Sequence, residues 1–269
     1  MITVELAQLL DRATANSEDP FQLPLAVSPW PVTLIVTGYL LFVLKLGRLF
    51  MANRAPYDLR TVLRVYNLLQ IVYNGTLFML AIYVIFVVRP YDLNCITVLP
   101  QDSPFKTVER VLSYAYYINK YFDLLDTIFI VLRKSYKQIS TLHLLHHMYM
   151  PITGYCVIRF SGYGGHLIVA GVLNLFVHVV MYSYYYISSQ IPPARRRFWW
   201  KEYITLLQML QFVIVFAHTI WTQMQPKCEV PKELTYMSLF AATALFLMFA
   251  NFYTHAYILA KTKKKQLND

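Results

Sequence analysis

Seven long apolar stretches, each bounded by charged residues or proline, constrain what this chain can fold into more than any other feature of its sequence. They run over Trp30–Leu46, Val62–Val88, Val108–Leu132, Ile139–Phe160, His166–Ser189, Phe198–Trp221 and Leu234–Ala260. Each is close to the roughly 20 residues that an α-helix needs to cross a bilayer. Only 14% of the residues are charged, against about a quarter in soluble domains. The sequence therefore predicts an all-α integral membrane protein with seven transmembrane helices in a single membrane domain over residues 1–269.

The lysine and arginine residues are unevenly distributed between the two sides of the predicted membrane. Of the 24, 16 fall on the side of the C-terminus and 7 on the opposite side, with Lys120 inside a span. Because cytosolic segments near helix ends are enriched in these residues, we expect a luminal N-terminal segment over residues 1–29 and a cytosolic basic tail over residues 261–269. The net charge of +10 then follows from topology and indicates no nucleic-acid partner. The lysine-rich tail is similar to retrieval signals of the endoplasmic reticulum, which predicts a protein of that membrane.

Two of the three cysteines fall in connections on the predicted luminal side. Cys95 lies between the second and third spans, and Cys228 lies between the sixth and seventh. Since the luminal compartment is oxidising, we predict a disulfide between them, with two unpaired thiols as the alternative. Cys156 lies inside the fourth span and is expected to be a reduced, apolar packing residue.

The third span carries ionisable residues that an ordinary membrane helix would avoid. Such residues are costly inside a bilayer, and they usually face a cavity and mark function. Lys120, Asp123 and Asp126 are spaced so that the first two share a helix face and the third lies at its edge. Lys120 and Asp123 can neutralise each other, either within a site or as an ion pair that only fixes helix packing.

The fourth span carries three histidines at positions i, i+3 and i+4. They are His143, His146 and His147. This spacing places all three imidazoles on one helix face, which is hard to explain by packing alone. We therefore expect the histidines to act together at one site.

The fifth and sixth spans add weaker signals. His178 is followed by Tyr182, Tyr184 and Tyr185, and the sixth span carries Gln208 and Gln211. Tyrosines near a helix end are also common interfacial anchors, and glutamines at this spacing also bridge helices.

Four polar residues from four different spans lie at one predicted depth. At about 1.5 Å per residue from the cytosolic end of each helix, that depth is roughly 12–16 Å. The residues are Asp123, His146, His178 and Gln208. One buried site open to the cytosol accounts for this alignment.

A neutral imidazole can act as base, metal ligand or nucleophile, so two enzyme classes compete for this site. One is a histidine-box, metal-dependent lipid desaturase or hydroxylase, and the other is an acyl-transfer enzyme that uses histidine directly. The three-histidine box with His178 is a small ligand set for two metal ions, although Asp123 and Asp126 can supplement it. A seven-span receptor shares the predicted topology but does not explain the buried histidines.

At these residues the sequence resembles the very-long-chain fatty acid elongase family. The segments HLLHH from His143, HVVMYSYY from His178 and TLLQMLQ from Thr205 fit that family's HxxHH, HxxMYxYY and TxxQxxQ motifs. The segment KYFDLLDT from Lys120 departs from the family's KxxExxDT, because Asp123 stands where the family has glutamate.

The resemblance implies a condensing enzyme that joins a long-chain acyl-CoA to malonyl-CoA, giving 3-ketoacyl-CoA, CoA and carbon dioxide. It implies an inverted barrel of spans two to seven around a substrate tunnel, no metal and no cofactor other than the substrates. His146 would carry the acyl group as an acyl-imidazole, with His178 opposite and His143 and His147 orienting the imidazoles. Gln208 and Gln211 would support the reaction by hydrogen bonds. A homodimer and association with other enzymes of the elongation cycle stay open.

Two further sets of residues are expected to contact the substrates. Because CoA carries phosphates, basic residues at the cytosolic mouth would bind it, although the positive-inside rule alone also explains them. This set contains Lys134, Lys137, Arg195 and Arg196. The second set would contact the substrates within the membrane and contains Asn174, Tyr182, Tyr184 and Tyr185.

Overall fold

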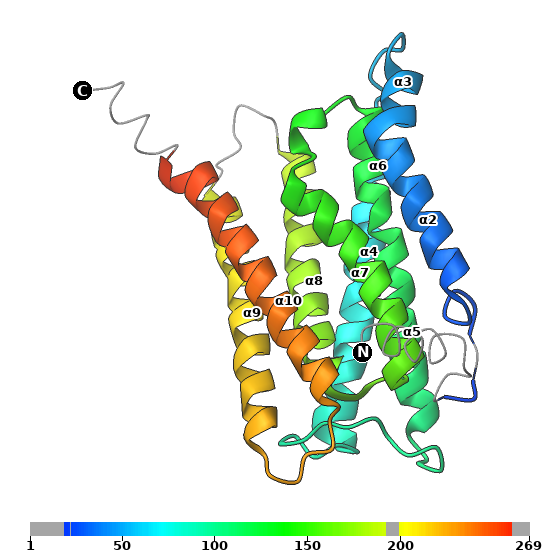
Figure 1. Ribbon diagram of the computed structural model, residues 1–269. Helices are drawn as coiled ribbons and strands as arrows, with labels where there is room; N and C mark the ends of the chain where they lie inside the picture. The colour runs from blue at the N-terminus through cyan, green and yellow to red at the C-terminus, as the bar shows by residue number, and fades with distance from the viewer. Residues whose placement is uncertain (1–18, 22, 192–198, 260–269) are drawn as a thin grey trace, which may run out of the picture. The chain divides into compact units, whose positions relative to one another are not determined.

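The computed structural model describes residues 19–21, 23–191 and 199–259, and within these ranges the chain forms helices and no strands (Figure 1). The basic tail and most of the predicted luminal N-terminal segment lie outside the described residues. The described residues divide into two compact units, one from within ranges 1–58 and 96–165 and the other from within ranges 59–95 and 166–269. The single membrane domain expected from the sequence stays a prediction.

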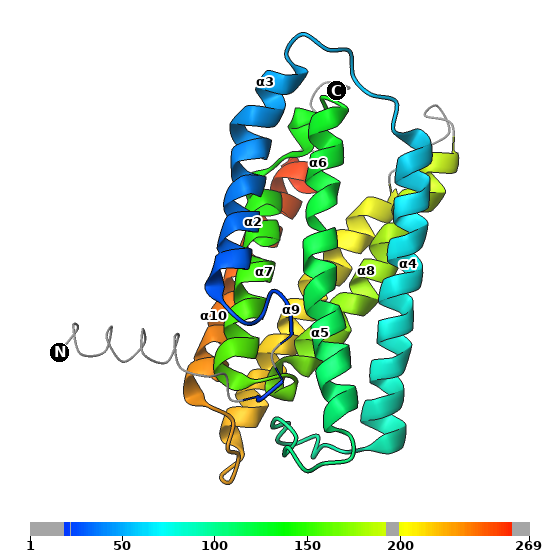
Figure 2. The same cartoon turned by 90° about the vertical axis from the view of Figure 1, so that its right-hand side faces the viewer.

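The first unit is built from two groups of helices. The N-terminal group contains α2 (Pro29–Leu41), η1 (Phe42–Leu46) and α3 (Gly47–Met51). The second group contains α5 (Lys106–Phe122), α6 (Leu124–Leu132), the short η3 (Tyr136–Gln138) and α7 (Thr141–Ser161). Helix α2 lies beside α7, and α3 lies beside α6 (Figure 2).

Close packing in the first unit depends on a glycine of α7. A Cβ atom added to Gly154 would lie 2.7 Å from Cδ2 of Tyr117 on α5, so only glycine allows these helices to approach so closely. Tyr117 is buried and belongs to a core that also contains Val36 of α2 and Tyr155 of α7. This core holds the histidine-bearing helix against both α2 and α5.

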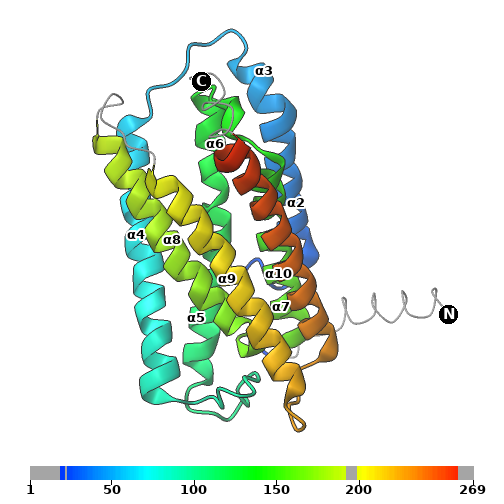
Figure 3. The same cartoon turned by 90° about the vertical axis from the view of Figure 1, so that its left-hand side faces the viewer.

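The second unit contains four long helices. They are α4 (Arg60–Tyr83), continued by η2 (Val84–Val88); α8 (Ile168–Gln190), preceded by η4 (Gly165–Leu167); α9 (Trp199–Met224); and α10 (Lys232–Tyr253), continued by η6 (Thr254–Ile258). Helix α4 packs along α8, and α9 packs against both α8 and α10. Helices α9 and α10 form an antiparallel hairpin (Figure 3).

Five described helices are long and apolar enough to cross a membrane. They are Pro29–Met51, Arg60–Val88, Gly165–Gln190, Trp200–Met224 and Lys232–Ile258. The other two expected spans correspond to α5 with α6 and to α7, the helices whose polar residues include the ion pair and the histidine box. The all-helical, multi-pass character is confirmed, and the total of seven spans stays a prediction.

The third expected span is two helices rather than one. Asp123 lies between α5 and α6 with φ −58° and ψ −25°. There the N–H of Asp126 donates to the carbonyl of Asp123 at 3.3 Å, three residues back rather than four. Such a tighter turn interrupts the α-helical ladder, and the interruption falls at an acidic residue of the predicted site.

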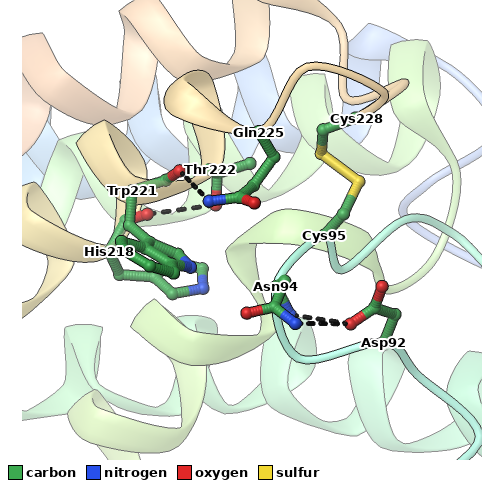
Figure 4. The surroundings of a disulfide bond; sticks show 8 residues. All are labelled: Asp92, Asn94, Cys95, His218, Trp221, Thr222, Gln225 and Cys228. Carbon is green, nitrogen blue, oxygen red and sulfur yellow. Dashed lines mark hydrogen bonds between the residues drawn. A yellow bond between two sulfur atoms is a disulfide. The ribbon is translucent and has the colours of Figure 1, made fainter.

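The predicted disulfide is present in the second unit. Cys95 and Cys228 are joined with their Cα atoms 5.5 Å apart (Figure 4). The bond connects the loop after η2 to the loop between α9 and α10. Cys156 is a free, half-buried thiol, as expected.

Candidate functional site

Helix α7 brings the three histidines of the box together. Its N-terminus is capped by Ser140, whose hydroxyl accepts a hydrogen bond from the N–H of His143 at 3.1 Å. The rings of His143 and His147 have their centroids 4.2 Å apart, and those of His146 and His147 5.7 Å apart. Four residues after His147, Pro151 lacks the N–H that would bond the His147 carbonyl. The predicted clustering of the three imidazoles is confirmed.

The first histidine of the box is oriented by residues from two other helices. Nε2 of His143 lies 2.8 Å from the hydroxyl of Thr127 on α6, which in turn lies 2.7 Å from the hydroxyl of Tyr39 on α2. Thr127 and Tyr39 are both buried. A buried hydrogen-bond chain of this kind fixes the orientation of the His143 ring.

His146 differs from His143 in its contacts. Its ring is half-buried, and no described residue forms a hydrogen bond with it. Lys120, Asp123 and His143 lie close enough to act on it electrostatically. The ion pair predicted in the third span therefore neighbours the middle histidine of the box.

Lys120 and Asp123 form a buried ion pair at the junction of α5 and α6. The Lys120 ammonium donates to a carboxylate oxygen of Asp123 at 2.9 Å, and both residues are almost fully buried. The ammonium also lies 4.7 Å from the centre of the Tyr116 ring. Asp126 is half-buried on α6 and acts electrostatically on Tyr39.

A second polar group lies in the other unit, on α4 and α8. His178 is buried, with its ring centroid 5.7 Å from that of Tyr182. The hydroxyls of Tyr182 and Tyr66 lie 3.3 Å apart. Gln70 donates to the Tyr66 hydroxyl at 3.1 Å, and Asn74 donates to the side-chain oxygen of Gln70, also at 3.1 Å. This group joins the predicted His178 and Tyr182 to three residues of α4.

The remaining predicted residues of the second unit have separate environments. Gln208 is half-buried and donates to the sulfur of Met181 at 3.8 Å, and Gln211 and Asn174 are buried. Tyr184 is half-buried, and Tyr185 is 41% exposed. The two units each hold part of the predicted site, and the common depth of these parts stays a prediction.

The basic residues expected to bind CoA are described in part. Lys134 ends the turn after α6 with φ 54°, and its ammonium donates to the carbonyl of Ala52 at 3.3 Å. Lys137 is exposed on η3. Arg195 and Arg196 lie outside the described residues.

The described side chains of this site are those of acyl-transfer chemistry rather than of one residue type alone, since imidazoles lie beside an ion pair. Within ranges 19–21, 23–191 and 199–259, no three or more His, Cys, Asp or Glu side chains have the spacing of a metal site. An imidazole next to a buried ion pair can serve as nucleophile or base in acyl transfer. Hydrogen-bond donors nearby can stabilise a developing oxyanion.

The sequence-based site did not include four residues that the structure joins to it. Tyr39 is linked to the box through Thr127. The hydroxyl of Tyr66 contacts that of Tyr182, Gln70 hydrogen-bonds Tyr66, and Asn74 hydrogen-bonds Gln70. A signal for Tyr66, Gln70 and Asn74 was available, since they recur every four residues and so share one face of a predicted membrane span. No local signal marks Tyr39, because a single tyrosine in a membrane helix is unremarkable.

Comparisons with known proteins agree with the motifs at this site. A sequence profile described as the GNS1/SUR4 family, ELO, matches residues 24–265. The chain is 43% identical to very long chain fatty acid elongase F of Drosophila melanogaster over 93% of its own length and 97% of the relative's. It is 37% identical to very long chain fatty acid elongase 7 of the same organism, over 93% and 76% of the two lengths. It is 33% identical to human very long chain fatty acid elongase 4, over 90% and 76%.

Proposed function

Because the chain belongs to the GNS1/SUR4 family, the family of very-long-chain fatty acid elongases, we propose that it catalyses the condensing step of elongation. In that step a long-chain acyl-CoA and malonyl-CoA give a 3-ketoacyl-CoA that is two carbons longer, with CoA and carbon dioxide released. The protein would act as a 3-oxoacyl-CoA synthase of the endoplasmic reticulum membrane. The substrates would be its only small-molecule partners, and no separate cofactor is required.

The observation that carries this proposal is the difference between the first two histidines of the box. Nε2 of His143 is engaged by Thr127, whereas no described residue hydrogen-bonds the ring of His146. An acyl carrier needs a ring nitrogen that can reach the thioester. His146 is therefore assigned as the nucleophile, and His143 and His147 as the residues that surround and orient it.

The reaction begins when a ring nitrogen of His146 attacks the thioester carbonyl of the acyl-CoA. The carbon–sulfur bond breaks, and CoA leaves with a proton, so that the acyl group remains on His146. Malonyl-CoA then loses carbon dioxide, and the electron pair of the broken carbon–carbon bond becomes an enolate. The enolate attacks the acyl carbon, the carbon–nitrogen bond breaks, and the departing ring nitrogen takes up a proton from water, so that the 3-ketoacyl-CoA is released and neutral His146 is regenerated.

Charge develops on oxygen at each of these steps, and the polar residues of both units are assigned to stabilise it. Lys120 with Asp123, and Asp126 nearby, set the electrostatic environment of the box in the first unit. In the second unit His178, Gln208 and Gln211 are the assigned donors, as preorganised dipoles are in other acyl-transfer enzymes. Asn174, Tyr182, Tyr184 and Tyr185 would contact the substrates. Lys134, Lys137, Arg195 and Arg196 would bind the CoA phosphates.

The proposed topology has seven spans, with spans two to seven forming a barrel around the acyl chain. The five apolar helices support it, and the disulfide between Cys95 and Cys228 supports an oxidising compartment for the loops after α4 and α9. The N-terminus would then be luminal and the basic tail cytosolic. A homodimer and association with the later enzymes of the cycle would be compatible with this arrangement.

Incubation of the purified protein with labelled malonyl-CoA and a long-chain acyl-CoA tests the reaction. The expected product is a labelled 3-ketoacyl-CoA two carbons longer, and its absence would refute the proposal. Mass spectrometry of the protein incubated with acyl-CoA alone should find the acyl group on His146, and an adduct on Cys156 would refute the assigned nucleophile. Stoichiometric iron bound at the histidines would instead favour a metal-dependent desaturase or hydroxylase.

A further inference from the structure

Four polar side chains form a continuous hydrogen-bonded series across the contact between α4 and α8. Asn74 donates to both the backbone and the side-chain oxygen of Gln70, at 2.8 and 3.1 Å. Gln70 donates to the hydroxyl of Tyr66, which lies 3.3 Å from that of Tyr182. The ring of Tyr182 stands edge-on to both the Tyr66 ring and the His178 ring. The series therefore ends at a residue that contacts His178.

Helix packing alone is a poor explanation for this series. All four side chains are buried, and Asn74 and Tyr182 have no exposed surface at all. Burying amides and hydroxyls in an apolar helix pair is unfavourable unless they are hydrogen-bonded, and apolar side chains would pack there at no such cost. Phe78 of α4 and Phe176 of α8 already provide an apolar contact between these helices, with centroids 5.6 Å apart.

The donors of the series are defined from Asn74 as far as Tyr66. The side-chain amide of Gln70 is a donor to Tyr66, so the Tyr66 oxygen is used as an acceptor there. At the contact between Tyr66 and Tyr182 either hydroxyl can donate its one proton, and in both cases the hydrogen bond holds the two hydroxyls together. A hydroxyl that accepts a hydrogen bond also becomes a stronger donor through its own proton.

We infer that Tyr66 is a positioning residue for the condensation, and that Gln70 and Asn74 hold it in place. Tyr66 fixes the Tyr182 hydroxyl and so holds the Tyr182 ring edge-on against the ring of His178, the residue that would act on the substrate. No covalent bond is made or broken by Tyr66, Gln70 or Asn74. The inference rests on the proposed function, since it assumes that the residues around His178 take part in condensation.

Tyr66→Phe tests the inference, because it removes one hydroxyl and keeps the ring. We expect kcat for condensation to fall about tenfold, the effect of losing one useful hydrogen bond, with the KM for acyl-CoA changed by less than about twofold. Gln70→Leu is a second variant and should lower kcat by a smaller factor. Tyr83→Phe is the matched control, since Tyr83 lies at the end of the same helix and is 56% exposed. A Tyr66→Phe enzyme with the kcat of the control would overturn the inference.

A double-mutant cycle separates positioning from two independent effects. If Tyr66 acts through Tyr182, the Tyr66→Phe/Tyr182→Phe enzyme should be no slower than Tyr182→Phe alone. If the double variant instead lowers kcat by the product of the two separate factors, Tyr66 does not act through Tyr182.

A spectroscopic measurement keeps the inference distinguishable from the proposed function. Ring-labelled histidine gives an NMR signal for His178, assigned by its loss in His178→Ala, and that signal should shift in Tyr66→Phe and not in Tyr83→Phe. If the wild-type protein makes no 3-keto product, the proposed function is wrong, yet the shift still supports the positioning of Tyr182 beside His178. An unchanged signal in Tyr66→Phe would overturn the positioning whatever the activity.

Discussion

The three histidines of the box share a helix face but not an environment. His143 is held by Thr127, which Tyr39 holds in turn, while His146 lies near the Lys120–Asp123 pair without a hydrogen bond from any described residue. Two histidines on one helix can therefore be assigned different roles, because different side chains surround each of them.

Loss of the Asp123 charge should destabilise the protein strongly. Lys120 is almost fully buried, and Asp123 neutralises it at 2.9 Å. Asp123→Asn removes that charge and is expected to lower the free energy of unfolding by about 3 kcal/mol. Thermal unfolding in detergent measures the change.

Two further variants separate stability from catalysis at this pair. Asp123→Glu keeps the charge and matches the residue that the family has, so it should destabilise the protein less than Asp123→Asn does. Lys120→Met/Asp123→Leu should recover most of the stability lost in Asp123→Asn and yet give no condensation product. An active double variant would mean that the ion pair only fixes helix packing.

At the scale of elements, the packing of the first unit depends on close approach of helices as well as on an apolar core. Helices α5 and α7 carry the ion pair and the box, and they meet where Gly154 contacts the Tyr117 ring. The same Tyr117 reaches the N-terminal segment through a hydrogen bond from its hydroxyl to the carbonyl of Leu25, at 3.0 Å.

Gly154→Ala should therefore lower stability, although alanine favours helices over glycine. Its Cβ would meet a buried ring at 2.7 Å, and overpacking of this kind costs about 1–3 kcal/mol. Gly38→Ala is the matched control, because no atom lies within 4 Å of its added Cβ. The control should gain up to about 1 kcal/mol from helix propensity. Equal melting temperatures for the two variants would contradict the close contact between α5 and α7.

The N-terminal segment is joined to α5 by charges whose effect depends on pH. Arg110 donates to both carboxylate oxygens of Asp19, at 3.0 and 3.1 Å, and Lys106 lies 3.7 Å away. Burial raises the pKa of Asp19, but the hydrogen bond from the Phe21 N–H and the hydrogen bond and charge of Arg110, with the charge of Lys106, outweigh burial and hold the pKa below 3.8.

A lowered pKa means that ionised Asp19 stabilises the folded state at every pH above 3.8, and that this stability is lost as the pH falls through the folded pKa. We expect Asp19→Asn to melt at a lower temperature than the wild type at neutral pH. The difference should shrink when the pH is lowered below 3.8. A difference that is constant across this range would show that Asp19 does not act through its charge.

For the whole molecule, the disulfide is the longest-range covalent constraint in the described chain. It joins residues separated by 133 positions, so its removal frees a very long loop in the unfolded state. Cys95→Ser/Cys228→Ser should lose about 3–5 kcal/mol by the chain-entropy estimate. Unfolding under oxidising and reducing conditions measures this loss. A reductant should lower the melting temperature of the wild type and leave that of the double variant unchanged.

Much of the fold and part of the candidate site follow from the sequence alone. The length of the apolar stretches predicted helices, because in lipid the backbone groups of a spanning segment must be hydrogen-bonded within that segment. The spacing of His143, His146 and His147 predicted their common face, and the i, i+3 spacing of Lys120 and Asp123 predicted their contact. These features are local, and helix periodicity is enough to determine them.

Tertiary structure decided the features that depend on residues far apart in the chain. Tyr39 and Thr127, 88 positions apart, form the hydrogen bond that supports His143, and Tyr66 and Tyr182, 116 positions apart, meet through their hydroxyls. Helix periodicity says which residues share a face but not which face of another helix they meet, because that depends on the packing of whole helices. The sequence by itself determined the helices and the clustered histidine box. Tertiary packing decided which side chains orient His143, since a hydrogen bond between helices forms only where packing brings a donor within about 3 Å of an acceptor.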